Sequence, residues 1–181
     1  VIIKIMKKLI WICAVFTCFN CDSGTGSNDD SGQTNTSALT VGDTFSGFEV
    51  LSVCANENIE YNHDDASKVI LLSLFASWCS TCQGHVSSLE SLHQQYSDQG
   101  LLVISAGKDI GNPYTCESWV TEFGASYMIA NDNSGEVEQQ FSIDGQVPYH
   151  VLIDKSKTVR YSASGYDQST LEALIQSTLA E

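Results

Sequence analysis

Short apolar runs alternate with amphipathic segments along most of this chain. Residues 69–75 and 101–105 are almost continuously apolar, which predicts two buried strands. Between them, residues 80–98 place apolar side chains at helical spacing and end before Gly100, which predicts an amphipathic helix. Strand, helix and strand in this order are typical of an α/β fold.

Further elements are predicted on both sides of this unit. Residues 45–53 and 59–61 read as a short N-terminal strand pair. Asn112 and Pro113 have the pattern of an N-cap followed by proline in the first turn, so we expect a helix to begin there and to end at Gly124.

The C-terminal half repeats the alternation. Residues 127–129 predict a short strand, and residues 134–141 predict a helix. Residues 151–153 and 158–161 flank a polar turn and therefore predict a hairpin. Ser169 opens a Ser-Thr-Leu-Glu segment with capping-box spacing, which predicts the start of the final helix.

One domain accounts for the length and composition. The chain has 181 residues, of which 43% are apolar, and this supports an α/β sandwich over residues 41–181 with a mixed central sheet flanked by helices. Its formal net charge of −14 comes from 22 acidic and 8 basic residues. Because binding to a phosphate backbone has no electrostatic basis at this charge, nucleic acid is excluded as a partner.

Residues 1–20 predict an export signal and not part of the fold. A short positively charged region precedes the apolar stretch at residues 9–16, which is too short for a comfortable membrane span. Met6 has the look of the true translation start. We therefore expect a signal peptide and an exported protein.

Residues 21–40 are expected to form a disordered polar tether. This tract cannot bury enough apolar surface to order itself. Cys21 stands between the signal-like segment and the tether, where it resembles the lipid-bearing cysteine of bacterial lipoproteins, with Cys18 as the alternative site. The expected location is the cell envelope, on a membrane lipid anchor facing the periplasm or the exterior. A soluble periplasmic or secreted protein is the alternative.

Four cysteines remain for the folded part: Cys54, Cys79, Cys82 and Cys116. Disulfides persist outside the cytoplasm, and four cysteines allow three connectivities. If Cys79 pairs with Cys82, then Cys54 and Cys116 are left either as a structural disulfide or as two separate buried thiols.

Cys79 and Cys82 stand at the junction of a predicted buried strand and the N-terminus of a predicted helix, which suits reversible disulfide chemistry. Unpaired backbone N–H groups and the helix dipole favour a thiolate there, so the pKa of Cys79 is expected to be depressed. Cys79 is then the nucleophile, and Cys82 resolves the mixed disulfide. Trp78 is expected to shape the surface beside the nucleophile, with core packing as the alternative.

Two segments carry a family resemblance: residues 75–82, Phe-Ala-Ser-Trp-Cys-Ser-Thr-Cys, and residues 145–154, Gly-Gln-Val-Pro-Tyr-His-Val-Leu-Ile-Asp. With the order of elements, they resemble the thioredoxin-like superfamily and, within it, the exported TlpA/ResA branch of membrane-tethered thiol-disulfide oxidoreductases. The resemblance implies a three-layer thioredoxin-like sandwich. It also implies that Pro148 is a cis-proline facing the active site, and that Val147 and Pro148 offer backbone groups to an extended substrate segment.

The same resemblance implies an activity and partners. It favours a reductase that receives electrons from a membrane donor of the CcdA/DsbD type. The implied substrates are disulfide-bearing exported proteins, among them apocytochrome c during cytochrome c maturation. No cofactor is implied.

The chain departs from that family at positions that handle protons. His85 and Ser87 stand where the branch commonly has glutamate and proline, and Ser73 stands where thioredoxins have a buried aspartate. His85 follows Cys82 by three residues on the same helical face and is a candidate base, with a solvent-facing histidine as the alternative. Ser80-Thr81 between the cysteines leaves the redox direction open.

Three other classes compete with this interpretation. A peroxiredoxin-like peroxide reductase shares the fold, but it needs threonine or serine three residues before its peroxidatic cysteine, and Cys79 takes that place ahead of Cys82. A zinc site lacks a second cysteine pair, and His63, His93 and His150 are scattered, so no metal is expected. A non-catalytic thioredoxin-fold lipoprotein is favoured by the missing glutamate.

Overall fold

A computed structural model describes residues 38–48, 51–54, 56–61, 67–141 and 145–181. They belong to a unit that runs from Asn35 to Glu181. The predicted signal peptide, both candidate lipidation sites and His63 lie outside the described residues. In the part of the chain described here, no helix has both the length and the apolar character needed to cross a bilayer.

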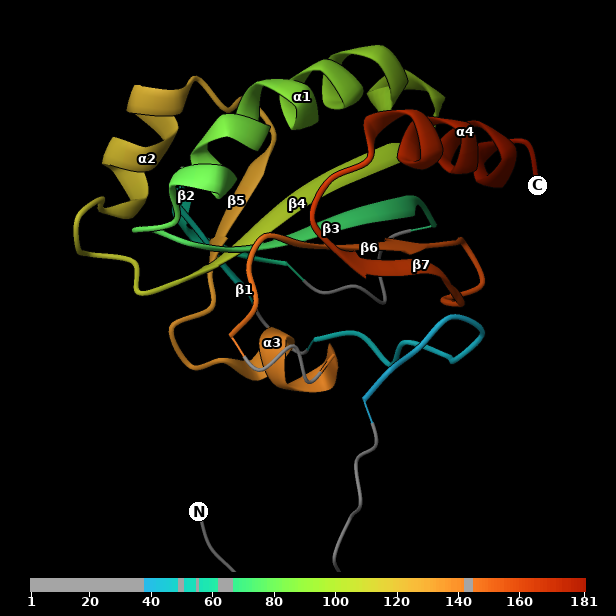
Figure 1. The fold of residues 1–181 in the computed structure, drawn as a ribbon, viewed down its shortest axis with the longest axis horizontal. Helices are drawn as coiled ribbons and strands as arrows, with labels where there is room; N and C mark the ends of the chain where they lie inside the picture. Colours follow the sequence, from blue (N-terminus) through green and yellow to red (C-terminus); the bar gives the residue numbers. More distant parts are fainter. Residues whose placement is uncertain (1–37, 49–50, 55, 62–66, 142–144) are drawn as a thin grey trace, which may run out of the picture. The chain divides into compact units, whose positions relative to one another are not determined.

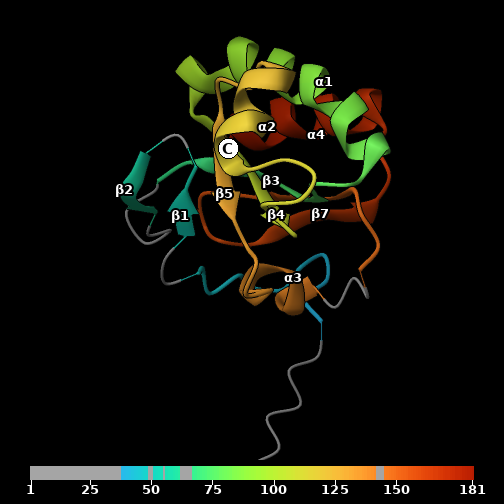
Figure 2. The same ribbon diagram turned by 90° about the vertical axis from the view of Figure 1, so that its left-hand side faces the viewer.

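Within the described residues, seven strands form one mixed sheet in the order β2-β1-β5-β4-β3-β6-β7. β3 at its centre pairs in parallel with β4 and antiparallel with β6, and β4 pairs in parallel with β5. β1 and β2 extend the sheet at one edge, and the β6–β7 hairpin closes the other (Figures 1 and 2). The strands are β1 (Leu51–Val53), β2 (Asn56–Tyr61), β3 (Val69–Ala76), β4 (Leu101–Lys108), β5 (Met128–Asn131), β6 (Tyr149–Ile153) and β7 (Val159–Ser164).

Helices cover both faces of this sheet. α1, α2 and α4 lie on one face and α3 lies on the other, which gives three layers (Figure 1). The helical segments are α1 (Ser80–Tyr96), the 3-10 turn η2 (Ser97–Gln99), α2 (Cys116–Phe123), α3 (Glu136–Phe141) and α4 (Gln168–Leu179). The predicted α/β class, the buried strands, the long first helix and the C-terminal hairpin are confirmed.

The core lies on both sides of β3, all eight residues of which are buried. Successive side chains of a strand point to opposite faces, so Leu71 and Phe75 pack toward α1 whereas Leu72 and Leu74 pack toward α3. This explains the continuous apolar run, because neither face of the strand meets water. Each fully buried leucine of this kind contributes about 1.5–3 kcal/mol relative to an exposed one.

Close packing over β4 depends on Gly107. The ring of Phe75 stacks on Trp119 with 4.4 Å between ring centroids, and Phe75 lies so close to Gly107 that a Cβ atom there would overlap the ring. Only glycine leaves space for this aromatic pair beneath the end of β4. The pair fixes α2 against the sheet beside the point where β3 ends.

The predicted start of the second helix at Asn112 is wrong. α2 begins at Cys116, and its N-cap is Thr115, whose Oγ1 accepts a hydrogen bond from the Ser118 backbone N–H at 3.1 Å. Asn112 and Pro113 are joined by a cis peptide bond in the preceding loop. Asn112 is held there by tertiary contact, since its carbonyl oxygen lies 2.7 Å from Ser77 Oγ.

The start of the last helix is also corrected. Asp167 is the N-cap of α4, and its carboxylate accepts hydrogen bonds from the Thr170 backbone N–H at 3.2 Å and from the Ser169 hydroxyl at 2.8 Å. The predicted capping box at Ser169 is therefore wrong by two residues. A carboxylate accepts hydrogen bonds from the first N–H groups of a helix and also interacts favourably with the helix dipole. Asp167 is therefore the N-cap in place of Ser169.

The N-terminal strand is shorter than predicted. Thr44 makes an isolated bridge with Thr158, and Phe45 and Phe48 are buried on the α3 face without belonging to a strand. Leu39 donates its backbone N–H to the Gln140 carbonyl at 2.8 Å. Backbone hydrogen bonds hold this segment against the start of β7, since the Gly42 N–H donates to the Val159 carbonyl at 2.8 Å and the Val159 N–H donates to the Asp43 carbonyl at 2.9 Å. The two aromatic rings pack on the α3 face of the sheet.

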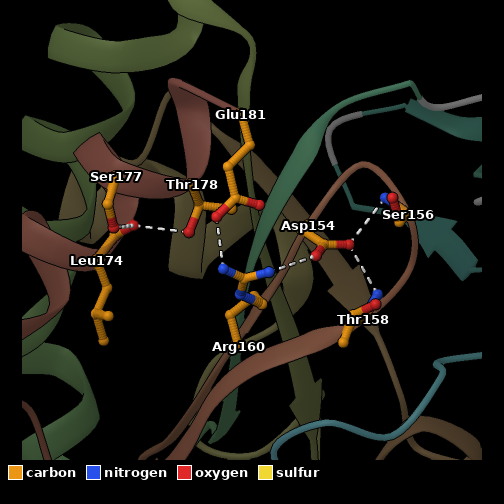
Figure 3. Close-up of polar contacts among 8 residues, drawn as sticks. All are labelled: Asp154, Ser156, Thr158, Arg160, Leu174, Ser177, Thr178 and Glu181. Carbon is orange, nitrogen blue, oxygen red and sulfur yellow. Dashed lines mark hydrogen bonds and ion pairs between the residues drawn. The ribbon is translucent and has the colours of Figure 1, made fainter.

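A carboxylate closes the β6–β7 hairpin and ties it to the chain end (Figure 3). Asp154 accepts hydrogen bonds from the backbone N–H groups of Ser156 at 2.8 Å and Thr158 at 2.9 Å, and from Arg160 at 3.2 Å. Arg160 also donates to Glu181 at 2.5 Å. Asp154 is buried, so its charge is balanced by these donors, and β6 is held rigidly at its C-terminal end.

Candidate active site

A disulfide joins Cys79 and Cys82 where β3 gives way to α1, with 5.2 Å between the two Cα atoms. Cys79 is the N-cap of α1, and its Sγ accepts a hydrogen bond from the Cys82 backbone N–H at 3.1 Å. The first turn of α1 contains no acidic residue. Once the disulfide is reduced, the N–H group and the helix dipole both favour negative charge on Cys79.

Side-chain contacts to the loop after β4 fix the turn before the cysteines. Ser77 Oγ lies within hydrogen-bonding distance of two carbonyl oxygens, 2.5 Å from that of Asp109 and 2.7 Å from that of Asn112. The Trp78 indole N–H donates to the Asp109 carboxylate at 2.7 Å. Trp78 is 55% exposed, so it forms surface beside Cys79, and the alternative of core packing is wrong.

A second segment reaches the dithiol from the start of β6. The Val147 carbonyl oxygen lies 3.8 Å from Cys79 Sγ, and the Val147–Pro148 peptide bond is cis. Pro148 is buried, and its carbonyl oxygen accepts a hydrogen bond from the Gly165 backbone N–H at 3.0 Å. Residues 68 positions apart in sequence thus place a backbone carbonyl beside the sulfur atom.

An open hollow of about 540 Å³ adjoins Trp78 on the side of the β4–α2 loop. Asn133 holds this loop in place, because its amide accepts from the Ile110 N–H at 2.8 Å and donates to the Ile110 carbonyl at 3.0 Å. The hollow is lined by Trp78, Asp109, Ile110, Gly111, Asn112 and Asn133. The hollow thus lies beside Trp78, the residue that precedes Cys79.

Two histidines and a tyrosine meet beneath the first turns of α1. The ring of His85 lies 5.8 Å from that of His150 and 4.8 Å from that of Tyr166, and His150 lies 5.1 Å from Tyr166. His150 on β6 is fully buried and faces Ser73 across the β3–β6 register. Within the described residues, His85 Nδ1 and both ring nitrogens of His150 are buried without a hydrogen-bond partner.

Burial keeps these three rings uncharged. It lowers the pKa of His85, and it lowers the pKa of His150 to about 3, with repulsion from His85 as a smaller cause. Burial also raises the pKa of Tyr166 to about 12. His85 is half-buried, with its Nδ1 inside the protein and the ring partly open to solvent. In the described part of the chain, no group of three or more potential ligands could hold a metal ion.

A second disulfide joins Cys54 and Cys116, with 5.0 Å between the Cα atoms. Cys54 lies in the turn between β1 and β2, and its backbone N–H donates to the Ile129 carbonyl at 2.7 Å. Cys116 is the first residue of α2. The bond connects the β1–β2 turn to the start of α2, which suits a structural role.

The AhpC/TSA family model matches residues 41–162, which is more than half of the chain. This protein belongs to the AhpC/TSA family. The match includes both segments of the dithiol site, the cysteine turn and the Val147–Pro148 segment.

Curated relatives carry related names. Thiol-disulfide oxidoreductase ResA of Oceanobacillus iheyensis is 22% identical over 129 residues, which cover 69% of this chain and 65% of ResA. Thiol:disulfide interchange protein DsbE of Pasteurella multocida is 28% identical over 106 residues, which cover 54% of this chain and 51% of that protein. The chain therefore spans less than two thirds of the length of either relative.

Solved structures share the fold of this family member. A protein described as a thiol:disulfide interchange protein DsbE from Chlorobium tepidum has a TM-score of 0.69 at 21% identity, covering 78% of this chain and 99% of that one. The thioredoxin domain of a thiol-disulfide oxidoreductase from Bacteroides vulgatus has a TM-score of 0.64 at 15% identity, covering 76% and 99%. These likenesses establish the thioredoxin-like fold.

Sequence patterns did not reveal two features of the site in this AhpC/TSA family member. No sequence pattern indicates the hydrogen bond between Asp109 and Trp78, which are 31 residues apart in sequence. His150 looks isolated in the sequence, and its meeting with His85 requires knowledge that β6 pairs with β3. The Leu-Phe-rich pattern of β3 and the apolar pattern of β6 predict two strands but leave their register undefined.

Proposed function

We propose that this protein is a thiol-disulfide oxidoreductase that reduces disulfides in cell-envelope proteins. The observation that carries the proposal is the position of Cys79 Sγ at the N-cap of α1, where it receives the Cys82 N–H at 3.1 Å. An N–H donor at a helix N-terminus stabilises the thiolate, which is the attacking species in disulfide exchange. The names of the ResA and DsbE relatives support the same chemistry.

The reaction proceeds by two exchanges. The Cys79 thiolate attacks one sulfur of a substrate disulfide, so that the substrate S–S bond breaks and a mixed disulfide forms. Cys82 then attacks Cys79 Sγ, the mixed disulfide breaks, and the second substrate sulfur leaves as a thiolate. Two electrons pass to the substrate, and the protein ends with the Cys79–Cys82 disulfide found in this structure.

Substrate binding is assigned to the two segments beside Cys79. The Val147 carbonyl lies 3.8 Å from Cys79 Sγ and accepts a hydrogen bond from an extended substrate backbone. Pro148 follows it, buried, with its own carbonyl oxygen accepting a hydrogen bond from the Gly165 N–H at 3.0 Å. The exposed Trp78 indole and the adjoining hollow take side chains next to the substrate cysteine. The substrate classes are misoxidised exported proteins and apocytochrome c.

Export and anchoring belong to the same proposal. Residues 1–20 direct the chain out of the cytoplasm, and Cys21, with Cys18 as the alternative, bears the lipid that tethers the domain to the membrane. A membrane donor of the CcdA/DsbD type returns the dithiol to its reduced state. Intact mass of the mature N-terminus tests the anchor, because an unmodified Cys21 would contradict lipidation.

The reduction potential of the dithiol and insulin reduction by the full chain test the activity. A potential below about −220 mV, toward that of thioredoxin, together with turnover supports a reductase. A potential near about −120 mV, typical of a strong periplasmic oxidant, would reverse the direction. If no reversible couple exists, the protein is a non-catalytic member of the fold.

Two substitutions separate the roles of the cysteines. Cys79→Ser should abolish insulin reduction, whereas Cys82→Ser should accumulate a mixed disulfide that denaturing electrophoresis without reductant detects. The same two variants distinguish the peroxiredoxin-like alternative. Peroxide consumption that outpaces insulin reduction and depends on either cysteine would favour a peroxide reductase.

A further inference from the structure

Resolution of the mixed disulfide requires that the Cys82 thiol lose its proton, because the thiolate is the species that attacks. Cys82 is only 4% exposed and lies one turn inside α1. Bulk water therefore has little access to this proton. A group inside the protein has to accept it.

His85 is placed to be that group. It follows Cys82 by three residues on α1, and side chains at this spacing lie about 5–6 Å apart on one helical face. Its Nδ1 is buried and has no hydrogen-bond partner within the described residues. A neutral imidazole offers one lone pair, so an unpartnered buried nitrogen is available for a proton.

His150 and Tyr166 close the space behind His85. The three rings lie next to one another, with centroids 4.8 to 5.8 Å apart. His85 comes from α1, His150 from β6 and Tyr166 from the loop before α4. Ser73 adds a buried hydroxyl at the position opposite His150 on β3. Two of these four polar side chains, Ser73 and His150, are buried, and a buried polar group requires a polar partner or a function.

Two electrostatic effects act on the His85 imidazole when Cys82 is reduced. Burial lowers the pKa of both histidines, so both rings are neutral at pH 7 and hold a proton less readily than in water. A thiolate beside His85 favours its charged form and offsets that burial. Other titratable groups near the cluster include Glu172 on α4 and Tyr127 before β5, which both interact electrostatically with Tyr166. Tyr161 on β7 is a further one, and burial raises its pKa.

We propose that His85 accepts the Cys82 proton during resolution, and that His150 and Tyr166 are positioning residues that hold the His85 ring toward Cys82. This inference rests on the proposed function. The Cys82 S–H bond breaks, its proton binds the His85 imidazole, and the thiolate attacks Cys79 Sγ. The substrate sulfur leaves with the electron pair of the broken S–S bond and is protonated by solvent, while His85 returns its proton to solvent.

The test follows the two exchanges separately in the full chain, with Cys13, Cys18 and Cys21 replaced by serine. Stoichiometric dithiothreitol reduces the Cys79–Cys82 pair, and mass spectrometry checks that Cys54 and Cys116 remain bonded. One equivalent of 5,5′-dithiobis(2-nitrobenzoate) is then added. The first release of coloured thiolate reports attack by Cys79, and the second release reports resolution by Cys82.

His85→Gln should slow the second release about 100-fold or more at pH 7, the usual contribution of a positioned base, and leave the first release unchanged. Its second phase should then rise with pH through about 8.5, as for an unassisted thiol. His150→Gln and Tyr166→Phe should slow the second phase by roughly tenfold and shift its pH profile. His93→Gln is the matched control on the same helix and should change neither phase.

Two results have distinct meanings. If the second phase of His85→Gln has the wild-type rate and pH profile, His85 is not the proton acceptor, and the proposed function is unaffected. Absence of the first phase in the otherwise wild-type chain would refute the proposed function itself. Circular dichroism checks each variant for folding, and if His150→Gln is unfolded, His85→Gln and the isosteric Tyr166→Phe decide the inference.

Discussion

Replacing Cys54 and Cys116 together by alanine removes the disulfide between the β1–β2 turn and the first residue of α2. The two cysteines are 62 residues apart in sequence, and the segment between them contains β2, β3, α1 and β4. The cross-link therefore restricts a large part of the unfolded chain. Its removal should lower the stability of the fold and leave the Cys79–Cys82 dithiol active.

The size of the effect follows from the length of the closed loop. In the chain-entropy account, a cross-link over 62 residues stabilises the folded state by about 4 kcal/mol at 25 °C. A domain has roughly 5–15 kcal/mol of net stability, so this bond supplies a large share. For a chain of this size, 4 kcal/mol corresponds to a fall in Tm of roughly 10 °C.

The assay is urea unfolding of the oxidised proteins, followed by circular dichroism and by the fluorescence of the buried Trp119. Cys79→Ala with Cys82→Ala is the matched control, because it removes a disulfide of sequence separation 3 and should cost only about 2 kcal/mol. If the long-range pair costs no more than the short-range pair, loop entropy is not the source of the stabilisation. Alkylation of Cys54 or Cys116 in the unreduced native protein would show that the bond is absent.

Three further predictions concern packing, the hairpin and the buried imidazole. Gly107→Ala overlaps an aromatic ring and lowers the free energy of unfolding by roughly 1–3 kcal/mol, whereas Gly84→Ala on the open face of α1 raises it by about 0.5–1 kcal/mol. Asp154→Ala removes hydrogen bonds from three donors and costs roughly 2–4 kcal/mol, whereas Glu181→Ala costs less than about 1 kcal/mol. Because burial lowers the pKa of His150 to about 3, only the unfolded chain binds its proton as the pH falls from 6.5. Wild-type stability should then be full above pH 6.5 and fall below it, by at most about 1.4 kcal/mol per pH unit, and His150→Gln should flatten this slope.

Urea unfolding measures all three, the last as a series across pH. Equal effects of the two glycine substitutions would contradict the packing argument over β4. A loss in Glu181→Ala as large as in Asp154→Ala would move the stabilisation from the hairpin carboxylate to the chain end. An unchanged pH slope in His150→Gln would mean that other groups cause the acid sensitivity.

Local patterns were sufficient to predict β3, α1 and β4, because apolar periodicity over a few residues reports which faces a segment buries. The starts of α2 and α4 were not predictable in the same way. Asparagine is a common N-cap residue, but the Asn112 carbonyl accepts a hydrogen bond from the Ser77 hydroxyl in the loop before α2. Thr115 is the N-cap of α2 instead. Asp167 competes successfully with Ser169 because a carboxylate accepts several N–H and O–H donors at once.

In the candidate site, too, local features were predicted from the sequence and long-range contacts were not. The Cys79–Cys82 turn was predicted from spacing, since both residues lie within one helical turn and the strand before them is a strong local signal. The contact between the His85 and His150 rings was not predicted, because only the pairing of β6 with β3 brings His150 to His85. The contact of Trp78 with Asp109 likewise depends on where the β4–α2 loop folds back.

By itself, the sequence determined that a dithiol lies at a strand-to-helix junction, with a helix N-terminus to favour the thiolate, because these relations involve neighbouring residues. Only the tertiary structure decided what surrounds that dithiol. It placed the Val147 carbonyl 3.8 Å from Cys79 Sγ and gathered His85, His150 and Tyr166 beneath α1. These contacts depend on strand register and on the paths of the loops. Periodicity along a chain does not encode which strand pairs with which.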